Sequence, residues 1–288
     1  MLIGHNRTLS PDAGIKVLGE RNSGTNVLET LLRENVDVNL HENIPILSPN
    51  MTPAPPDGPF PKGDRGQAAH EAMIDHMHYA QLPDNGGWKH AAPDHRFTQE
   101  FLSRKTPSVL IIVRHPASWL RSMHKNPFHA LVAIPRDFGT FIRQPWLTVA
   151  RDSLGPRLFS SLPDMLAAKM AAYADLLAHY DNSCLLRYED LVQEPDRTLR
   201  AIGLAPGHPV TDALPDHDIR GFLSRQRAFR PFAKAENFRK RAAAVSYEGL
   251  APRDRAFLLE RLSDSILMQL YPLDQCCFAP LKRQKPIL

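Results

Sequence analysis

The sequence predicts an α/β fold, a three-layer sandwich in which helices cover both faces of a central, mostly parallel sheet. Short apolar runs typical of buried strands alternate along the chain with segments of helical periodicity. A turn containing Gly19 and Gly24 separates the first strand from the first helix. The 288 residues suffice for one large domain, so we predict a single domain over residues 1–288.

The first strand–helix unit is predicted at residues 15–33. Residues 15–18 form a short apolar strand, residues 19–26 form the turn, and apolar side chains then recur at helical spacing, at Val27, Leu28, Leu31 and Leu32. Seven prolines follow within residues 41–63, and they exclude a regular helix or a central strand there. We therefore expect a long, proline-rich loop at 41–80 within the same domain.

The second unit contains the clearest strand of the sequence. Residues 108–113 (SVLIIV) form a continuous apolar run, typical of a parallel strand buried on both faces. A helix is expected to begin at Pro116, because proline suits the first helical turn. A helix starting near Pro163, a buried strand at 183–187 and a closing helix at 253–271 complete the predicted pattern.

Positive charge is concentrated towards the C-terminal end. The formal net charge is +4, yet eleven basic and four acidic residues lie between Arg220 and Arg261. Such a segment indicates an anionic partner, either nucleic acid or a phosphorylated small molecule, while a solvated surface would account for the same charges. The segment lacks regular aromatic interleaving, so we expect no nucleic acid.

Composition disfavours several classes of protein. No run of about 18 apolar residues occurs, so we expect no membrane span, and residues 1–14 lack the apolar core of a secretory leader. Three cysteines, two of them adjacent, cannot form a disulfide framework and suit a reducing cytoplasm. No cysteine and histidine cluster has zinc spacing, so we expect no metal.

Residues 19–26 (GERNSGTN) have the arrangement of a P-loop-like turn that binds phosphate. A turn between a strand and a helix directs backbone N–H groups at an anion, and the helix dipole favours negative charge there. Gly24 allows close approach of the backbone, and Ser23, Thr25 and Asn26 add donors. The glycine spacing matches the nucleoside-triphosphatase loop GxxxxGK(S/T), but the lysine that reaches the β- and γ-phosphates is missing. An ordinary glycine-containing turn is the alternative.

Three segments occur in the order and spacing of one family. Residues 19–26 resemble the 5′-phosphosulfate loop of the sulfotransferases that use 3′-phosphoadenosine-5′-phosphosulfate (PAPS). Residues 113–122 (VRHPASWLRS) resemble the family's 3′-phosphate segment, and residues 186–195 (LRYEDLVQEP) resemble the element that follows it. Together they span residues 15–195, about two thirds of the chain. The resemblance implies a sulfotransferase-like domain that uses PAPS, releases adenosine 3′,5′-bisphosphate and requires no metal.

The cofactor-binding residues implied by the resemblance lie in these segments and in a basic loop further along: Arg21, Asn22, Ser23, Gly24, Thr25, Asn26, Arg114, Ser122, Tyr188, Arg239 and Lys240. Arg114 also has a physical argument, because a guanidinium at the C-terminal end of a buried strand is well placed to clamp a phosphate. Ser122 adds a hydroxyl donor. Tyr188 is expected either to face the adenine or to organise the fold beside it, and Arg239 and Lys240 to complete the 3′-phosphate site.

Residues 86–93 (GGWKHAAP) resemble the family's segment that carries the catalytic base. Sulfuryl transfer removes the acceptor's proton, and neutral imidazole suits that near pH 7, so His90 is the predicted base. Lys89 and Arg21 are predicted to stabilise charge on the leaving phosphate. Two departures stand out: Asn22 occupies a position where the family has lysine or arginine, and Lys89 is adjacent to His90, so on a strand only one would line the site.

The predicted function is therefore transfer of a sulfuryl group from PAPS to a hydroxyl or amine of a small-molecule or carbohydrate acceptor, in the cytoplasm. The loop at 41–80, which ends in His76, Met77, His78 and Tyr79, is expected to determine acceptor specificity. Two alternatives remain open, a P-loop kinase-like phosphotransferase and a non-catalytic nucleotide-binding module.

Overall fold

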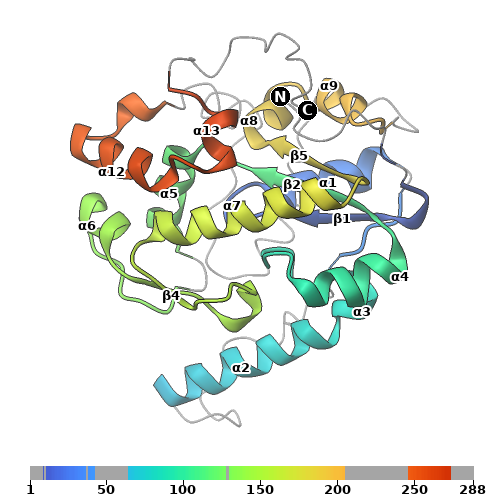
Figure 1. Ribbon diagram of the computed structural model, residues 1–288, viewed down its shortest axis with the longest axis horizontal. Helices are drawn as coiled ribbons and strands as arrows, with labels where there is room; N and C mark the ends of the chain where they lie inside the picture. Colours follow the sequence, from blue (N-terminus) through green and yellow to red (C-terminus); the bar gives the residue numbers. More distant parts are fainter. Residues whose placement is uncertain are drawn as a thin grey trace.

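A three-stranded parallel sheet lies at the centre of the computed structural model, which describes residues 9, 11–36, 38–42, 64–127, 130–204 and 246–273 (Figure 1). Strand β2 (Ser108–Val113) lies between β1 (Ile15–Leu18) and β5 (Ser183–Arg187). Every residue of the three strands is buried, as the continuous apolar run of β2 predicts for that strand. Two short antiparallel strands, β3 (Trp146–Leu147) and β4 (Leu158–Phe159), form a separate sheet.

The helices connect these strands, and together they make the described part of the chain a mixed α/β structure. The α-helices are α1 (Thr25–Asn35), α2 (Asp64–Ala80), α3 (Leu82–Asn85), α4 (Ser103–Lys105), α5 (Pro116–Lys125), α6 (Phe138–Arg143), α7 (Leu162–His179), α8 (Tyr188–Gln193), α9 (Pro195–Ala201), α12 (Pro252–Leu262) and α13 (Ile266–Leu270). Short helical turns are η1 (Pro11–Ala13), the π-helical η2 (Phe97–Leu102), η3 (Ala150–Asp152) and η4 (Tyr247–Gly249).

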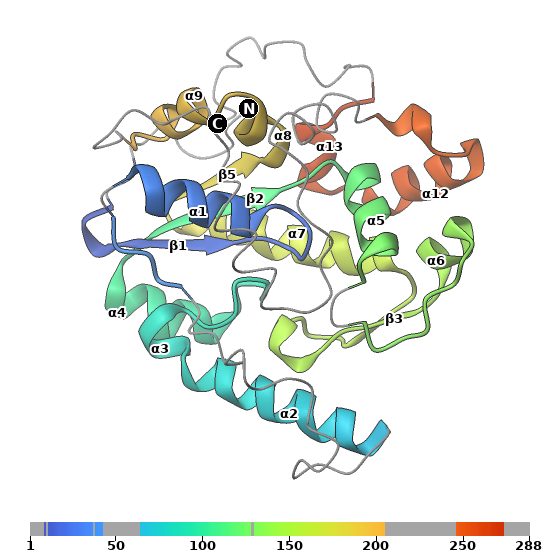
Figure 2. The same ribbon diagram turned by 180° about the vertical axis from the view of Figure 1, so that it is seen from behind.

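The two faces of the central sheet belong to different hydrophobic clusters. Val109 and Ile111 of β2 pack in one cluster with residues of α5, α6, α7, α12 and α13. Leu110 and Ile112 face the other way and pack with α1, α8 and α9. Figure 1 is seen from the α7 side, and Figure 2 from the α1 side. Because successive side chains of a strand point to opposite faces, the run SVLIIV supplies both clusters at once.

The prediction of a loop at 41–80 is wrong for the second half of that range. Residues 64–80 form α2, while residues 43–63 lie outside the described residues. All seven prolines of this region precede α2, and Asp64–Ala80 contains none, so nothing in that stretch interrupts a backbone hydrogen-bond ladder. The prediction extended the effect of the prolines beyond the residues that carry them.

The single closing helix predicted at 253–271 is also wrong, because α12 ends at Leu262 and α13 begins at Ile266. Residues 263–265 (SDS) lie between the two helices. The Ser265 hydroxyl accepts a hydrogen bond from the Leu267 amide at 3.3 Å and caps the new helix. Serine and aspartate side chains compete for backbone groups in this way, which favours caps and turns over a helix interior.

Candidate functional site

The turn between β1 and α1 has a backbone that suits only certain residues. Gly24 has φ of +102°, and a Cβ at that position would overlap the ring of Tyr188. Asn22 also has a positive φ, of +61°. The Ser23 hydroxyl donates to the Glu20 carbonyl at 2.5 Å, so its first partner is the turn itself. Helix α1 begins at Thr25, and the first amide groups of a helix have no acceptor within that helix.

Arg114, from the segment 113–122, contacts both this turn and Tyr188 of the segment 186–195. Its Nε donates to Ser118 Oγ at 2.9 Å and its Nη1 to the Asn22 carbonyl at 3.1 Å. The guanidinium also lies 4.9 Å from the centroid of the Tyr188 ring. Gly24, Arg114, Ser118 and Tyr188 therefore form one group, which we call the Arg114 cluster.

The Arg114 cluster follows from the strand register. Val113 and Arg187 are partners in the β2–β5 pairing, so the residues that follow them emerge side by side at the C-terminal ends of the two strands. Ser122 lies one helical turn beyond Ser118 on α5 and is partly exposed. The sequence analysis missed Ser118, although its spacing of four residues from Arg114, with a helix starting at Pro116, was a usable signal.

The rest of residues 186–195 anchors Tyr188. Glu189 is buried, and its Oε1 accepts from the His115 amide at 3.1 Å. The Tyr271 hydroxyl donates to Glu189 Oε2 at 2.6 Å, and burial raises the pKa of the Glu189 carboxyl. Arg187 donates to Asp190 at 2.7 Å, which completes a local clamp. These neighbours have structural roles, and Tyr188 is the member that faces the turn.

Arg21 does not lie with the Arg114 cluster. Only 3% of its side chain is exposed, and its guanidinium is paired with Glu20 at 2.9 Å and with Asp152 at 2.8 Å. Although burial alone would lower its pKa, the two carboxylates raise that pKa above its ordinary value. The guanidinium also stacks 4.6 Å from the Trp88 ring. The predicted contact of Arg21 with a leaving phosphate is therefore corrected to a place inside the fold, because opposite charges hold the side chain there.

Two further residues complete this buried charge group. Lys169 of α7 is fully buried and pairs with Asp152 at 2.8 Å and with Glu20 at 2.5 Å. Glu20, Arg21, Asp152 and Lys169 thus form a balanced set, which we call the charge quartet. The sequence analysis missed three of its members. The usable signal was Lys169, a charged residue within the apolar face of α7.

His90 lies in a turn over the end of β1. Its Nδ1 is 2.7 Å from the Gly19 carbonyl oxygen. A carbonyl only accepts, so Nδ1 carries the hydrogen and Nε2 keeps its lone pair. The pKa of His90 lies well below its ordinary value because of burial and the positive charges of Lys89 and Arg21. The imidazole is therefore neutral near pH 7, with the tautomer of a general base.

Lys89 contacts the same turn as His90, which corrects the expectation that only one of them would. Its Nζ donates to Asn26 Oδ1 at 2.6 Å and pairs with the Glu29 carboxylate. The side chain is 15% exposed. Strand alternation does not apply in a turn, so both side chains reach residues 19–29. Lys89 is thus a cation at the start of α1.

The remaining predicted residues differ in their surroundings. The Asn22 amide donates to the Asn126 carbonyl at 3.0 Å and ties the turn to the end of α5. Thr25 is buried. Arg239 and Lys240 lie outside the described residues, so their predicted part in the site remains a prediction.

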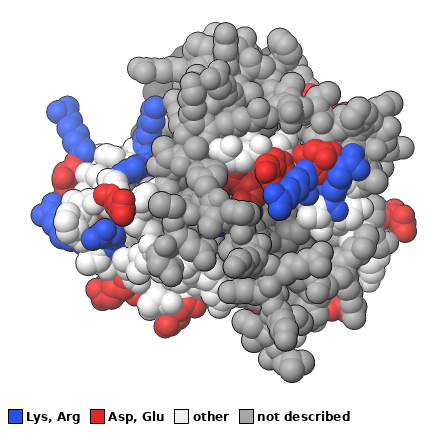
Figure 3. Space-filling view, turned by 90° about the horizontal axis from the view of Figure 1, so that it is seen from above, with Lys and Arg blue, Asp and Glu red and all other residues white. Residues whose placement is uncertain are grey.

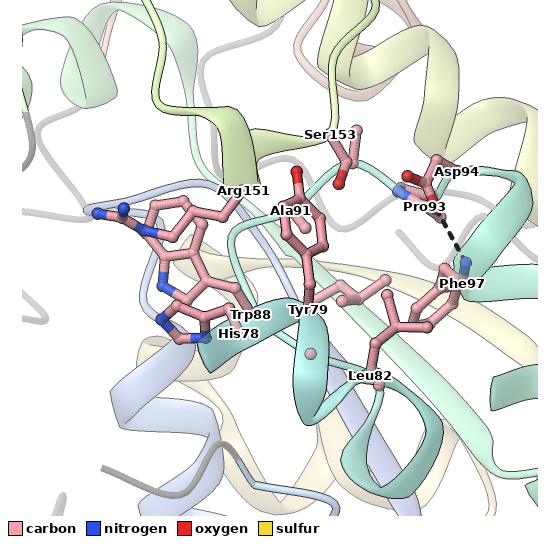
Figure 4. Close-up of a pocket in the computed structure, with 14 residues that line it drawn as sticks. His78, Tyr79, Leu82, Trp88, Ala91, Pro93, Asp94, Phe97, Arg151 and Ser153 are labelled. Carbon is pink, nitrogen blue, oxygen red and sulfur yellow. Dashed lines mark hydrogen bonds between the residues drawn. The ribbon is translucent and has the colours of Figure 1, made fainter. Parts of the chain in front are cut away.

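A small pocket lies beside the loop of residues 86–94 (Figure 4). Its walls include His78, Tyr79, Trp88 and Arg151, and its free volume of about 10 Å³ holds at most one water molecule. The Arg151 guanidinium lies 4.6 Å from the Trp88 ring and pairs with Glu71 and Asp75, each at 2.7 Å. Burial is the main reason that the pKa of His78 falls to about 3. The pocket is too small for a nucleotide. It does include two residues from the segment expected to determine acceptor specificity, His78 and Tyr79.

The described surface does not carry the concentrated positive charge of residues 220–261. Three basic and three acidic residues lie in its described part, at 246–261, and the excess belongs to residues 220–245, outside the described residues. Figure 3 shows basic and acidic side chains next to each other on the described surface. Within the described ranges, no helix is long and apolar enough to cross a membrane.

Comparison with known proteins assigns no family to the chain. No protein-family model matches the sequence, and no curated protein matches it. In the part of the chain that the structure describes, no three His, Cys, Asp or Glu side chains are grouped so as to hold a metal ion. Inferences about function therefore depend on the geometry of the Arg114 cluster, the charge quartet and the His90 turn.

Proposed function

We propose that the protein is a sulfotransferase that moves a sulfuryl group from PAPS to a hydroxyl or amine acceptor, on a three-layer α/β/α fold with a P-loop-like turn. The observation that carries the proposal is the Arg114 cluster. A glycine turn, an arginine and a tyrosine meet at the C-terminal ends of adjacent parallel strands, where open α/β sheets bind nucleotides.

The residues present offer two anion sites. Gly24 and the first amides of α1 suit the 5′-phosphosulfate, because a helix N-terminus attracts anions and Gly24 allows close approach. Arg114 suits the 3′-phosphate. Among the described residues its Nη2 meets no acceptor, so that edge of the guanidinium is available for a phosphate. Ser122 lies on the same helix and adds a hydroxyl.

His90 and Lys89 supply the reacting groups in this proposal. Bound PAPS supplies a sulfuryl group attached to a phosphate leaving group. His90 Nε2 takes the acceptor's proton as the acceptor oxygen or nitrogen attacks sulfur. Lys89, placed at the start of α1, stabilises negative charge on the phosphate side. Arg21 has no part in this step, since its charge is neutralised within the quartet.

The position of Arg21 favours a second candidate, a nucleotide-binding module that does not catalyse transfer. Asn22 stands where the resembling family has a cation, and Arg21 does not replace that cation. Of the two cations predicted to stabilise the leaving phosphate, Arg21 and Lys89, only Lys89 lies outside the quartet, and it is already paired with Glu29. Such a protein would bind the nucleotide through the Arg114 cluster without transferring the sulfuryl group.

Calorimetric titration with adenosine 3′,5′-bisphosphate tests the proposed cofactor, with ATP·Mg²⁺ and 5′-AMP as comparison ligands. We expect the bisphosphate to bind tightly and Arg114→Ala to weaken it about tenfold or more, because charge-assisted hydrogen bonds are lost. Arg121→Ala is the control: Arg121 is on the same helix, is exposed and contacts the Gly249 carbonyl. Absence of bisphosphate binding overturns the proposal, and preferential binding of ATP·Mg²⁺ supports the kinase alternative.

A transfer assay separates the two candidates. Radiolabelled PAPS is incubated with the protein and with acceptors of different classes, such as 4-nitrophenol and glucosamine. Label transfer that is lost in His90→Gln, with bisphosphate affinity retained, supports the sulfotransferase. Tight bisphosphate binding with no transfer to any acceptor favours the non-catalytic module.

A further inference from the structure

Two buried lysines from distant elements bind the loop that carries His90. Lys16 of β1 donates from Nζ to the Gly87 carbonyl at 2.7 Å. Lys169 of α7 donates from Nζ to the His90 carbonyl at 2.6 Å. The exposed fractions of the two side chains are 1% and 0%. Burying an ammonium group is costly unless it gains strong partners, so these contacts point to a specific role.

The charge quartet determines where Lys169 can be. Its ammonium lies between the carboxylates of Glu20 and Asp152, which compensate its burial. Asp152 contacts the same loop directly, since the Ala92 amide donates to the Asp152 carbonyl at 2.8 Å. The quartet therefore holds the loop at two points, His90 and Ala92. Lys16 holds it at a third point, Gly87.

The orientation of the His90 imidazole depends on where these contacts hold the loop. The Gly19 amide donates to the Lys89 carbonyl at 3.0 Å, and the Gly19 carbonyl faces His90 Nδ1 at 2.7 Å. The edge-on ring of Trp88, with its centroid 5.3 Å from that of His90, packs beside it. The Nδ1–Gly19 bond is possible only while the His90 backbone stays in register with Gly19, and the two lysines maintain that register.

We propose that Lys169 and Lys16 are positioning residues of the reacting centre, which hold the His90 loop so that the imidazole keeps its hydrogen on Nδ1 and presents Nε2 as the base. The catalytic consequence rests on the proposed function, whereas the tautomer does not. The charged groups around His90 are Lys89 from its own loop, Arg21 from the turn after β1 and Lys169 from α7, with Glu20 and Asp152 opposing the last two.

Nitrogen-15 NMR of labelled histidines tests the proposal on the full chain, with His90→Gln used to assign the signal. The wild type should show the Nδ1-protonated tautomer. Lys16→Met and Lys169→Met should each shift the tautomer ratio about tenfold towards Nε2 protonation, the effect of losing one buried hydrogen bond to the loop. Lys169→Met should also raise the pKa of His90, because a nearby cation is removed.

Tyr180→Phe is the matched control. It removes a 2.6 Å bond to the Pro107 carbonyl at the opposite end of β2, and it should leave the His90 signal unchanged. A wild-type protein with hydrogen on Nε2 overturns the proposal. Folded lysine variants with the wild-type tautomer ratio overturn it equally. If Lys169→Met fails to fold, Lys16→Met decides.

Ligand binding separates this inference from the proposed function. Neither lysine belongs to the Arg114 cluster, so both variants should keep the affinity for adenosine 3′,5′-bisphosphate while kcat for transfer falls and KM for PAPS stays near its wild-type value. If the wild type does not bind the bisphosphate, the proposed function fails, yet the tautomer measurement still decides whether the lysines position His90.

Discussion

The two halves of the turn at residues 19–26 make opposite use of charge. In the first half, Glu20 and Arg21 are buried and belong to the charge quartet, where two cations balance two carboxylates. In the second half, Gly24 opens onto Arg114 and Tyr188, and the guanidinium there is partly exposed. An arginine within a glycine-containing turn is therefore not automatically available to a ligand. In this protein the cations beside the second half of the turn, Arg114 and Lys89, come from other segments of the chain.

The largest effect is expected from breaking the quartet. Asp152→Asn leaves Arg21 and Lys169 without the carboxylate that lies 2.8 Å from each, and it should lower the free energy of unfolding by about 3–5 kcal/mol. Urea denaturation measures the change. Glu100→Gln, which removes an exposed carboxylate paired with Arg96, is the control and should leave stability unchanged. A loss as small as the control's would show that the quartet does not stabilise the fold.

Two arginine variants, one from each half of this comparison, are expected to have opposite effects on stability and on bisphosphate affinity. Arg21→Gln should destabilise the fold by about 3 kcal/mol or more, with bisphosphate affinity of the folded protein unchanged. Arg114→Gln should do the reverse, with near wild-type stability and affinity weakened by about 1.5–3 kcal/mol. Denaturation and calorimetry on both variants provide the four measurements. Weakened bisphosphate binding by folded Arg21→Gln would show that Arg21 contributes to the binding site.

Gly24→Ala tests the second half of the turn on its own. The positive φ disfavours alanine by about 1–2 kcal/mol, and the added Cβ displaces the Tyr188 ring, so both stability and bisphosphate affinity should fall. Gly155→Ala is the matched control, because among the described residues a Cβ there meets no atom within 4 Å. Equal behaviour of the two variants would contradict the close Gly24–Tyr188 approach.

The smallest expected effect is the change in stability per pH unit that comes from Lys16. Burial, opposed by Glu29, lowers its pKa from 10.5 to about 7 in the folded state. The unfolded chain therefore binds more protons between about pH 7 and 10.5, and stability rises with pH across that interval, by about 1 kcal/mol per pH unit. Lys16→Met should abolish this contribution. Denaturation from pH 7 to 9 measures it, and parallel curves for wild type and variant would contradict it.

Local patterns were enough to predict much of the fold. The strand at 108–113 and the turn with Gly24 follow from short runs of sequence, because apolar continuity and glycine geometry are local properties. Arg114 and Tyr188 were singled out separately, and the structure brings them together because both residues directly follow neighbouring parallel strands. These parts of the candidate site depend on backbone direction more than on side-chain choice.

The parts that were missed depend on long-range pairing. Nothing near Arg21 in sequence shows that Asp152 will pair with it or that Lys169 will share that carboxylate, because these contacts form only when η3 and α7 pack against the turn. The expectation that only one of Lys89 and His90 would line the site failed for a related reason: the backbone of this turn is bound by Gly19 and Lys169 rather than by a neighbouring strand. Helix α2 was hidden by the prolines that precede it.

The strand order has a consequence for folding during synthesis. Ile15 pairs with Ser108, and Val109 pairs with Ser183, so a nascent chain cannot close its sheet until β5 has left the ribosome. Such non-local pairing folds slowly, because chain entropy is lost before the contacts that repay it are made. Glu20 and Arg21 emerge early and must remain hydrated until Asp152 and Lys169 arrive. A truncated translation product ending before α7 would lack Lys169, so Glu20 and Asp152 would have Arg21 as the only cation of the quartet.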